Sequence, residues 1–160
     1  MKRLLLSLVL IACASACAPL TVDPRLEEAR QLIAQGRVEE GLARVEAMIE
    51  QDPRSAELRA FLARERELAI TRWLAQADFA RSSGNFADAE RHLDRILRLE
   101  PGNSRATLVR EEVRRARRHE EQVAEANAAL AQGDIERSET LTRAVLSENP
   151  QQRGAWELQR

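Results

Sequence analysis

Apolar side chains recur every three or four positions through most of the chain after residue 23, which is the spacing of one face of an α-helix. Two stretches, residues 55–83 and 104–132, contain no Gly or Pro and hold this spacing throughout, so each predicts one long helix. We expect these long helices to kink or break near Ala69 and near His119. Shorter helices are predicted between them, for about seven in all: residues 24–35, 38–51, 55–83, 86–99, 104–132, 135–148 and 152 onward.

A repeat of 48 to 49 residues underlies this pattern. Three glycines open the repeating segments, a small residue follows five positions later, and a proline follows 17 positions after each glycine. Glycine permits the positive φ that turns the chain after a helix, a small residue lets paired helices approach closely, and proline stops the second helix. The repeated positions are Gly36, Gly84 and Gly133; Gly41, Ala89 and Ser138; and Pro53, Pro101 and Pro150.

These positions resemble the second half of a tetratricopeptide repeat, and the first half also matches in places. Trp73 stands where that family has an early Trp, and Ala29, Ala77 and Ala126 stand at its small first-helix position. The period differs from the family's usual 34 residues. The resemblance implies an all-α solenoid of helical hairpins, with long and short helices alternating, over residues 24–160. Its units would span about residues 24–53, 70–101 and 119–150.

The same resemblance implies where partners would bind. The family's concave-face positions correspond here to Arg30, Asp78 and Asn127, with Leu74 and Val123 nearby. A solvent-facing role without a ligand is the simpler interpretation of each polar residue. Trp73 and Trp156 lie on apolar stripes, which favours packing between helices over a role as interface anchors.

The first 17 residues have the features of a secretory signal peptide. A positive start, Met1-Lys2-Arg3, precedes a short apolar run that is well below the roughly 20 residues needed to span a bilayer. The segments that end at Cys13 and at Cys17 both resemble the lipobox of bacterial lipoproteins. We favour lipidation of Cys17, with Cys13 as the alternative, and cleavage that leaves an unlipidated Cys17 is a third possibility. Residues 18–23 would then be a tether. The resemblance to enterobacterial lipoproteins implies the outer membrane, because no Asp follows either cysteine, and the helical domain would face the periplasm.

Charge and composition argue against nucleic acid as a partner. The formal net charge is −1, and it becomes −3 once Lys2 and Arg3 are removed with the signal peptide, so no long-range field attracts polyanions. The densest basic run, Arg110 to Arg118, is interleaved with glutamates at ion-pairing distances along a helix, such as Glu111 with Arg115 and Arg117 with Glu121. We therefore expect other proteins as partners.

No grouping of residues predicts catalysis, a metal or a cofactor. His92 and His119 fall on different predicted helices and are interpreted as incidental surface residues, and no Gly-rich phosphate loop is present. The adjacent pair Glu111-Glu112 points in two directions on a helix, so it cannot share a proton. The protein is expected not to be an enzyme.

Lipobox and repeats together resemble two kinds of secretion protein. One is the N-terminal repeat region of outer-membrane secretins of type II secretion or type IV pilus systems, in which case residues 1–160 would be a leading part of a longer protein. The other is a self-contained lipoprotein similar to the pilotins that deliver secretins. A general scaffold for envelope assembly is the alternative, and an enzyme or small-molecule binder is a more remote one.

Overall fold

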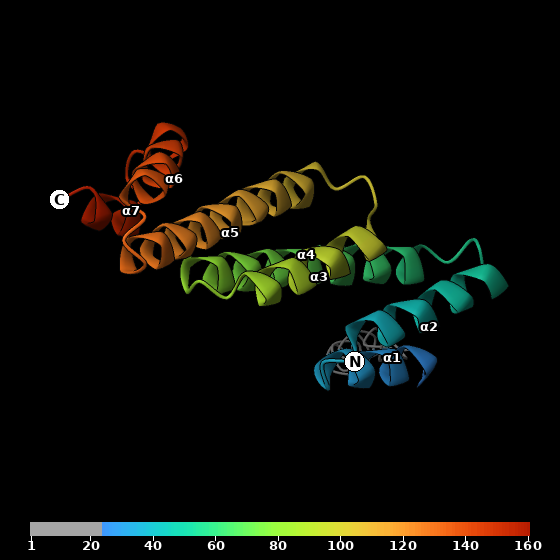
Figure 1. Ribbon diagram of the computed structural model, residues 1–160. Coiled ribbons are helices and arrows are strands. Elements are labelled where there is room, and N and C mark those ends of the chain that lie inside the picture. The colour runs from blue at the N-terminus through green and yellow to red at the C-terminus, as the bar shows by residue number, and fades with distance from the viewer. Residues whose placement is uncertain (1–23) are drawn as a thin grey trace, which may run out of the picture. The chain divides into compact units, whose positions relative to one another are not determined.

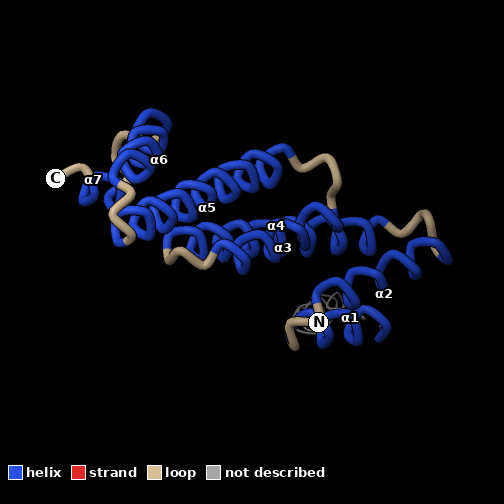
Figure 2. The backbone as a smooth tube through the Cα atoms, in the orientation of Figure 1, coloured by secondary structure: helices blue, strands red, loops and turns tan. Residues whose placement is uncertain are grey.

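The computed structural model describes residues 24–160, and within this range the chain forms helices and connecting loops with no strand (Figures 1 and 2). The predicted all-α, tetratricopeptide-like fold is confirmed, and the predicted helix ends lie within one or two residues of the observed ones. No helix in this range is long and apolar enough to cross a membrane. The helices are α1 (Pro24–Ala34), α2 (Val38–Gln51), α3 (Ala56–Ser82), α4 (Phe86–Leu99), α5 (Ser104–Ala131), α6 (Ile135–Glu148) and α7 (Arg153–Leu158).

Neither long helix breaks where we expected a break. Helix α3 runs without interruption through Ala69, and α5 runs without interruption through His119. Both residues are buried, with exposed fractions of 5% each, so they belong to the packed face of their helix. No Pro removes a backbone hydrogen bond there and no Gly weakens the helix, so the helical backbone continues through each site.

Each glycine turn closes one helix and begins the next. Gly36, Gly84 and Gly133 have φ of 83°, 74° and 80°, a region that glycine enters without a steric cost. At Gly84 the glycine N–H donates to the carbonyl of Arg81, and the next N–H, of Asn85, donates to that of Ala80. This pair of bonds is the Schellman motif, and it recurs at the other two glycines.

The proline turns also repeat in detail. After α2, α4 and α6 the chain passes through Pro53, Pro101 and Pro150, and a polar side chain then accepts a hydrogen bond at the start of the following helix. The accepting side chains are those of Ser55, Asn103 and Gln152, which bond the backbone N–H groups three residues later. Three copies of both turns show that the sequence repeat is a structural one.

The described chain falls into two compact units, which divide within α3 between Leu62 and Ala63. In the first unit, α1, α2 and the start of α3 share one core, built from Leu26, Ala29, Val45, Met48, Leu58 and Phe61. In the second unit, α4 packs on α5, α5 on α6, and α7 on both α5 and α6. Its fully buried side chains include Trp73, Leu93, Ile96, Val113 and Val145.

The small residues of the repeat are buried, and at Gly41 the paired helices approach closely. Ala89 is 0% exposed and Ser138 is 4% exposed. A Cβ atom built on Gly41 would lie 2.6 Å from Cγ1 of Ile33 and 2.9 Å from the backbone oxygen of Ala29. Since both distances are shorter than van der Waals contact, α1 and α2 can keep this spacing only with glycine at position 41.

Replacing Gly41 by valine is expected to destabilise the first unit by about 1–3 kcal/mol, because the added carbons overpack the contact with α1. The control is Gly102→Val, since a Cβ at Gly102 meets nothing within 4 Å. Thermal unfolding followed by circular dichroism measures both variants. Equal stability of the two would contradict the close approach of α1 and α2.

Candidate protein-binding groove

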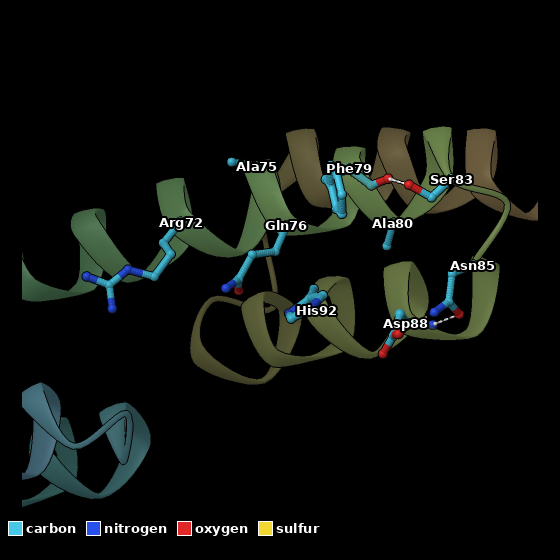
Figure 3. Close-up of a pocket in the computed structure, with 9 residues that line it drawn as sticks. All are labelled: Arg72, Ala75, Gln76, Phe79, Ala80, Ser83, Asn85, Asp88 and His92. Carbon is cyan, nitrogen blue, oxygen red and sulfur yellow. Dashed lines mark hydrogen bonds between the residues drawn. The ribbon is translucent and has the colours of Figure 1, made fainter.

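A groove of about 460 Å³ lies between the C-terminal half of α3 and the start of α4, inside the second unit (Figure 3). Its volume falls in the range of roughly 300–1,000 Å³ that is typical of ligand sites. The α3 side contributes most of the wall, and the α4 side closes it. The lining residues are Arg72, Ala75, Gln76, Phe79, Ala80, Ser83, Asn85, Asp88 and His92.

The wall from α3 is largely apolar. Ala75 and Phe79 lie one helical turn apart, and Ala80 follows directly, so the three share a side of the helix. Phe79 is 74% exposed, the largest exposed fraction among the exposed large apolar residues of residues 24–160. An aromatic ring left in water beside a groove is typical of a surface that another molecule covers.

One end of the groove is fixed by the N-terminal cap of α4. The side-chain oxygen of Asn85 accepts a hydrogen bond from the backbone N–H of Asp88 at 3.4 Å, and its amide nitrogen donates to the Asp88 carboxylate. Asp88 also pairs with Arg91. The carboxylate of Asp88 therefore already has partners of its own at this end of the groove.

Two polar groups in the groove lack a partner. Nδ1 of His92 is buried and has no hydrogen-bond partner, and Arg72 forms no ion pair with any residue of the described range. Gln76 and His92 point toward each other across the groove, without a hydrogen bond between them (Figure 3). Burial lowers the pKa of His92, and the nearby Arg95 lowers it further, so its imidazole is neutral at neutral pH.

The five contact residues expected from the family resemblance do not line this groove. Leu74 and Val123 are 5% and 6% exposed and pack inside the helical layers, so the expectation that they face a partner is corrected. Their apolar side chains belong to the helix faces that pack against neighbouring helices.

The three polar residues among the five expected contact residues each form a contact within the chain. Arg30 pairs with Glu27 at 3.5 Å and lies over the ring of Phe61, 5.3 Å from its centroid. Asp78 pairs with Arg81 at 3.6 Å. The amide nitrogen of Asn127 donates to the carbonyl of Val123 within α5 at 3.0 Å. A partner-binding role for these three residues stays a prediction.

His119 is not the surface residue that the sequence suggested. It is 5% exposed, and its Nε2 lies 3.1 Å from Oε2 of Glu148, which joins α5 to the end of α6. A histidine on the buried face of a helix can reach a carboxylate on the neighbouring helix, and this partner is too distant in sequence to predict. Residues 24–160 hold no group of three His, Cys, Asp or Glu side chains placed to bind a metal.

The hydrogen bond from His119 lowers the pKa of Glu148. A carboxyl group with a lowered folded-state pKa stabilises the fold above its ordinary pKa, and loses this effect as the pH falls through the folded value. We therefore expect Glu148→Gln to lower the melting temperature slightly at neutral pH, and the difference from the wild type to vanish at acidic pH. Thermal melts over a pH series measure this, and a difference that does not change with pH would contradict the pairing.

The basic run on α5 forms ion pairs, as expected, although with partly different partners. Arg117 pairs with Glu121 at 3.5 Å as predicted, whereas Glu111 pairs with Arg114 at 3.0 Å and not with Arg115. Arg117 also reaches Glu90 on α4 at 3.2 Å. The arginines of this run therefore form ion pairs within α5 and between α5 and α4.

The two tryptophans differ in environment. Trp73 is 1% exposed and lies in the core, as expected. Trp156 is 50% exposed, so the expectation that it packs between helices is corrected. Its indole N–H donates to the carbonyl of Pro150 at 2.5 Å, which holds the ring against the turn that precedes α7.

Comparison with known proteins supports the repeat assignment. Residues 74–119, less than half of the chain, match the family model of the tetratricopeptide repeat. The match begins at Leu74 in α3 and ends at His119 in α5, so it includes every residue that lines the groove except Arg72, all of α4 and the first half of α5. No curated protein and no solved structure matches the chain. The chain thus contains a tetratricopeptide-type repeat, which includes the end of α3, the turn after it and all of α4.

Proposed function

We propose that this protein is a membrane-anchored scaffold of the bacterial envelope, which binds other proteins for a secretion or pilus assembly machine. The observation that carries the binding role is the open apolar groove on a rigid helical repeat, with Phe79 exposed beside it. Tetratricopeptide repeats suggest a protein-protein interaction scaffold. A groove on regular helices keeps its shape without a ligand, which reduces the entropy lost on binding.

The anchor would be a lipid on Cys17, or on Cys13 in the alternative, and both lie outside the described residues. Several acyl chains on one cysteine give a durable attachment, whereas a single chain gives only marginal binding. Residues 18–23 would hold the helical domain close to the outer membrane on its periplasmic side.

The link to secretion rests on sequence resemblance. Two segments are similar to the repeat regions of secretins. One is residues 36–44, with a glycine turn and the start of α2, and the other is residues 99–106, with a proline turn and the start of α5. A scaffold at the outer membrane could recruit or position the subunits of such a pore. The proposed role is binding alone.

The proposal is tested by cross-linking intact cells, solubilising the membranes in detergent and purifying the tagged full-length chain. Secretin or pilus proteins recovered with the chain, and absent when an unrelated lipoprotein carries the same tag, would support it. Recovery of envelope-assembly proteins without any secretion component would favour the alternative, a general scaffold for envelope assembly. Recovery of the chain alone would contradict a scaffold function.

A further inference from the structure

The middle repeat differs from its two neighbours at the surface that forms the groove. The sequence repeat aligns Phe79 with Gln31 in the first hairpin and with Ala128 in the last. Gln31 and Ala128 are exposed, as their polar or small side chains allow. Only at Phe79 does this repeated position carry a large apolar side chain, so its exposure is a property of one repeat and not of the fold.

In the two neighbouring repeats, an ion pair connects the two helices on the face that corresponds to the groove. Glu28 on α1 pairs with Arg44 on α2 at 3.4 Å, and Glu125 on α5 pairs with Arg137 on α6. Gln76 occupies the position of both glutamates in the middle repeat. No ion pair joins the groove-lining residues of α3 to those of α4, so the space that charged side chains fill elsewhere is left open.

The charged side chains that line the groove favour an acidic partner over a basic one. Its one acidic residue, Asp88, is already paired, whereas the guanidinium of Arg72 has no ion-pair partner in the described chain and Nδ1 of His92 has no hydrogen-bond partner. A carboxylate that approaches along α3 would meet an uncompensated cation. A basic group would meet only that same cation, which disfavours it.

From these observations we propose that the groove between α3 and α4 binds a protein segment that inserts one bulky apolar side chain beside Phe79 and places an acidic residue against Arg72. The proposal rests on the proposed scaffold function and specifies the partner that this function requires. An apolar anchor supplies the affinity of such an interface, and the charge pair supplies its orientation.

The test uses the purified full-length chain in detergent and a displayed library of random short peptides. Enriched peptides are then synthesised, and their binding is measured by fluorescence anisotropy to the wild type and to three variants. Phe79→Gln introduces the residue of the first repeat at an exposed site, and Arg72→Glu reverses the free charge. Ala128→Gln makes a comparable exposed change at the aligned position of the last repeat, as the control.

The expected peptides share a bulky apolar residue with Asp or Glu close to it in sequence. Phe79→Gln should weaken their binding about tenfold or more, as for a central interface residue, and Ala128→Gln should leave it unchanged. Selection on Arg72→Glu should favour Lys or Arg in place of the acidic residue. Circular dichroism of the variants, which alter only exposed side chains, checks that all remain folded.

Any of four results would overturn the proposal. Peptides that bind the wild type and Phe79→Gln equally would place the binding surface elsewhere and leave the scaffold function standing. Selected peptides without acidic residues would remove the role of Arg72. A wild-type dimer that Phe79→Gln converts to a monomer would assign the groove to a second copy of the chain. Failure to select any peptide, together with recovery of the chain alone in the cell cross-linking experiment, would overturn both proposals.

Discussion

Replacing Trp73 by alanine is expected to lower the stability of the second unit by about 3–5 kcal/mol, which is the usual cost of truncating a buried tryptophan. The side chain is 1% exposed, and the guanidinium of Arg95 on α4 lies 4.2 Å from the centroid of its ring. Alanine would therefore leave a cavity in the second unit and remove a cation–π contact between α3 and α4. A domain of ordinary stability loses a large share of its folding free energy in such a change.

The chain contains a matched control, because its only other tryptophan is half-exposed. Trp156→Ala should cost clearly less, since half of its side chain is already exposed to solvent, although one hydrogen bond is lost as well. Urea unfolding followed by circular dichroism compares both variants with the wild type. Similar unfolding midpoints for the two variants would contradict the placement of Trp73 in the core.

Replacing both Cys13 and Cys17 by serine is expected to move the protein from the membrane to the soluble periplasm. A serine hydroxyl cannot take the place of the thiol that would carry the lipid. The expected effect is nearly complete, because a durable anchor depends on the acyl chains. Fractionation of cells, with carbonate washing of the membranes, measures it.

The single variants identify the modified residue. Loss of the anchor in Cys17→Ser alone would assign the lipid to Cys17, and loss in Cys13→Ser alone would assign it to Cys13. Incorporation of labelled palmitate into the wild type and not into the double variant gives an independent readout. Retention of the double variant in washed membranes would show that the protein is not anchored as a lipoprotein.

The helices and turns could be predicted from the sequence because their signals are local. Gly36, Gly84 and Gly133 mark the Schellman turns, and the apolar stripes give the helix bounds to within one or two residues. The family match to residues 74–119 supports the same repeat. The continuity of α3 and α5 was harder to predict, since length alone suggested a break and packing decides whether one occurs.

The groove could not be predicted from periodicity, because it depends on which repeat carries which side chain. The family's concave positions pointed to Leu74 and Val123, which are buried, and not to Phe79 or His92. A signal was nevertheless present in the sequence: Phe79 replaces the Gln and Ala of the aligned positions, and Gln76 replaces two glutamates. Comparing the repeats with one another would have revealed it.

The most direct test of the account places a photoreactive amino acid at Ala75 or at Ala124 of the full-length chain in living cells. Both residues are exposed alanines at aligned positions, but Ala75 lines the groove and Ala124 lies on the charged face of the last repeat. A discrete cross-linked protein is expected from position 75 and none from position 124. No adduct at position 75, or the same adducts at both positions, would contradict a protein-binding scaffold that acts through this groove.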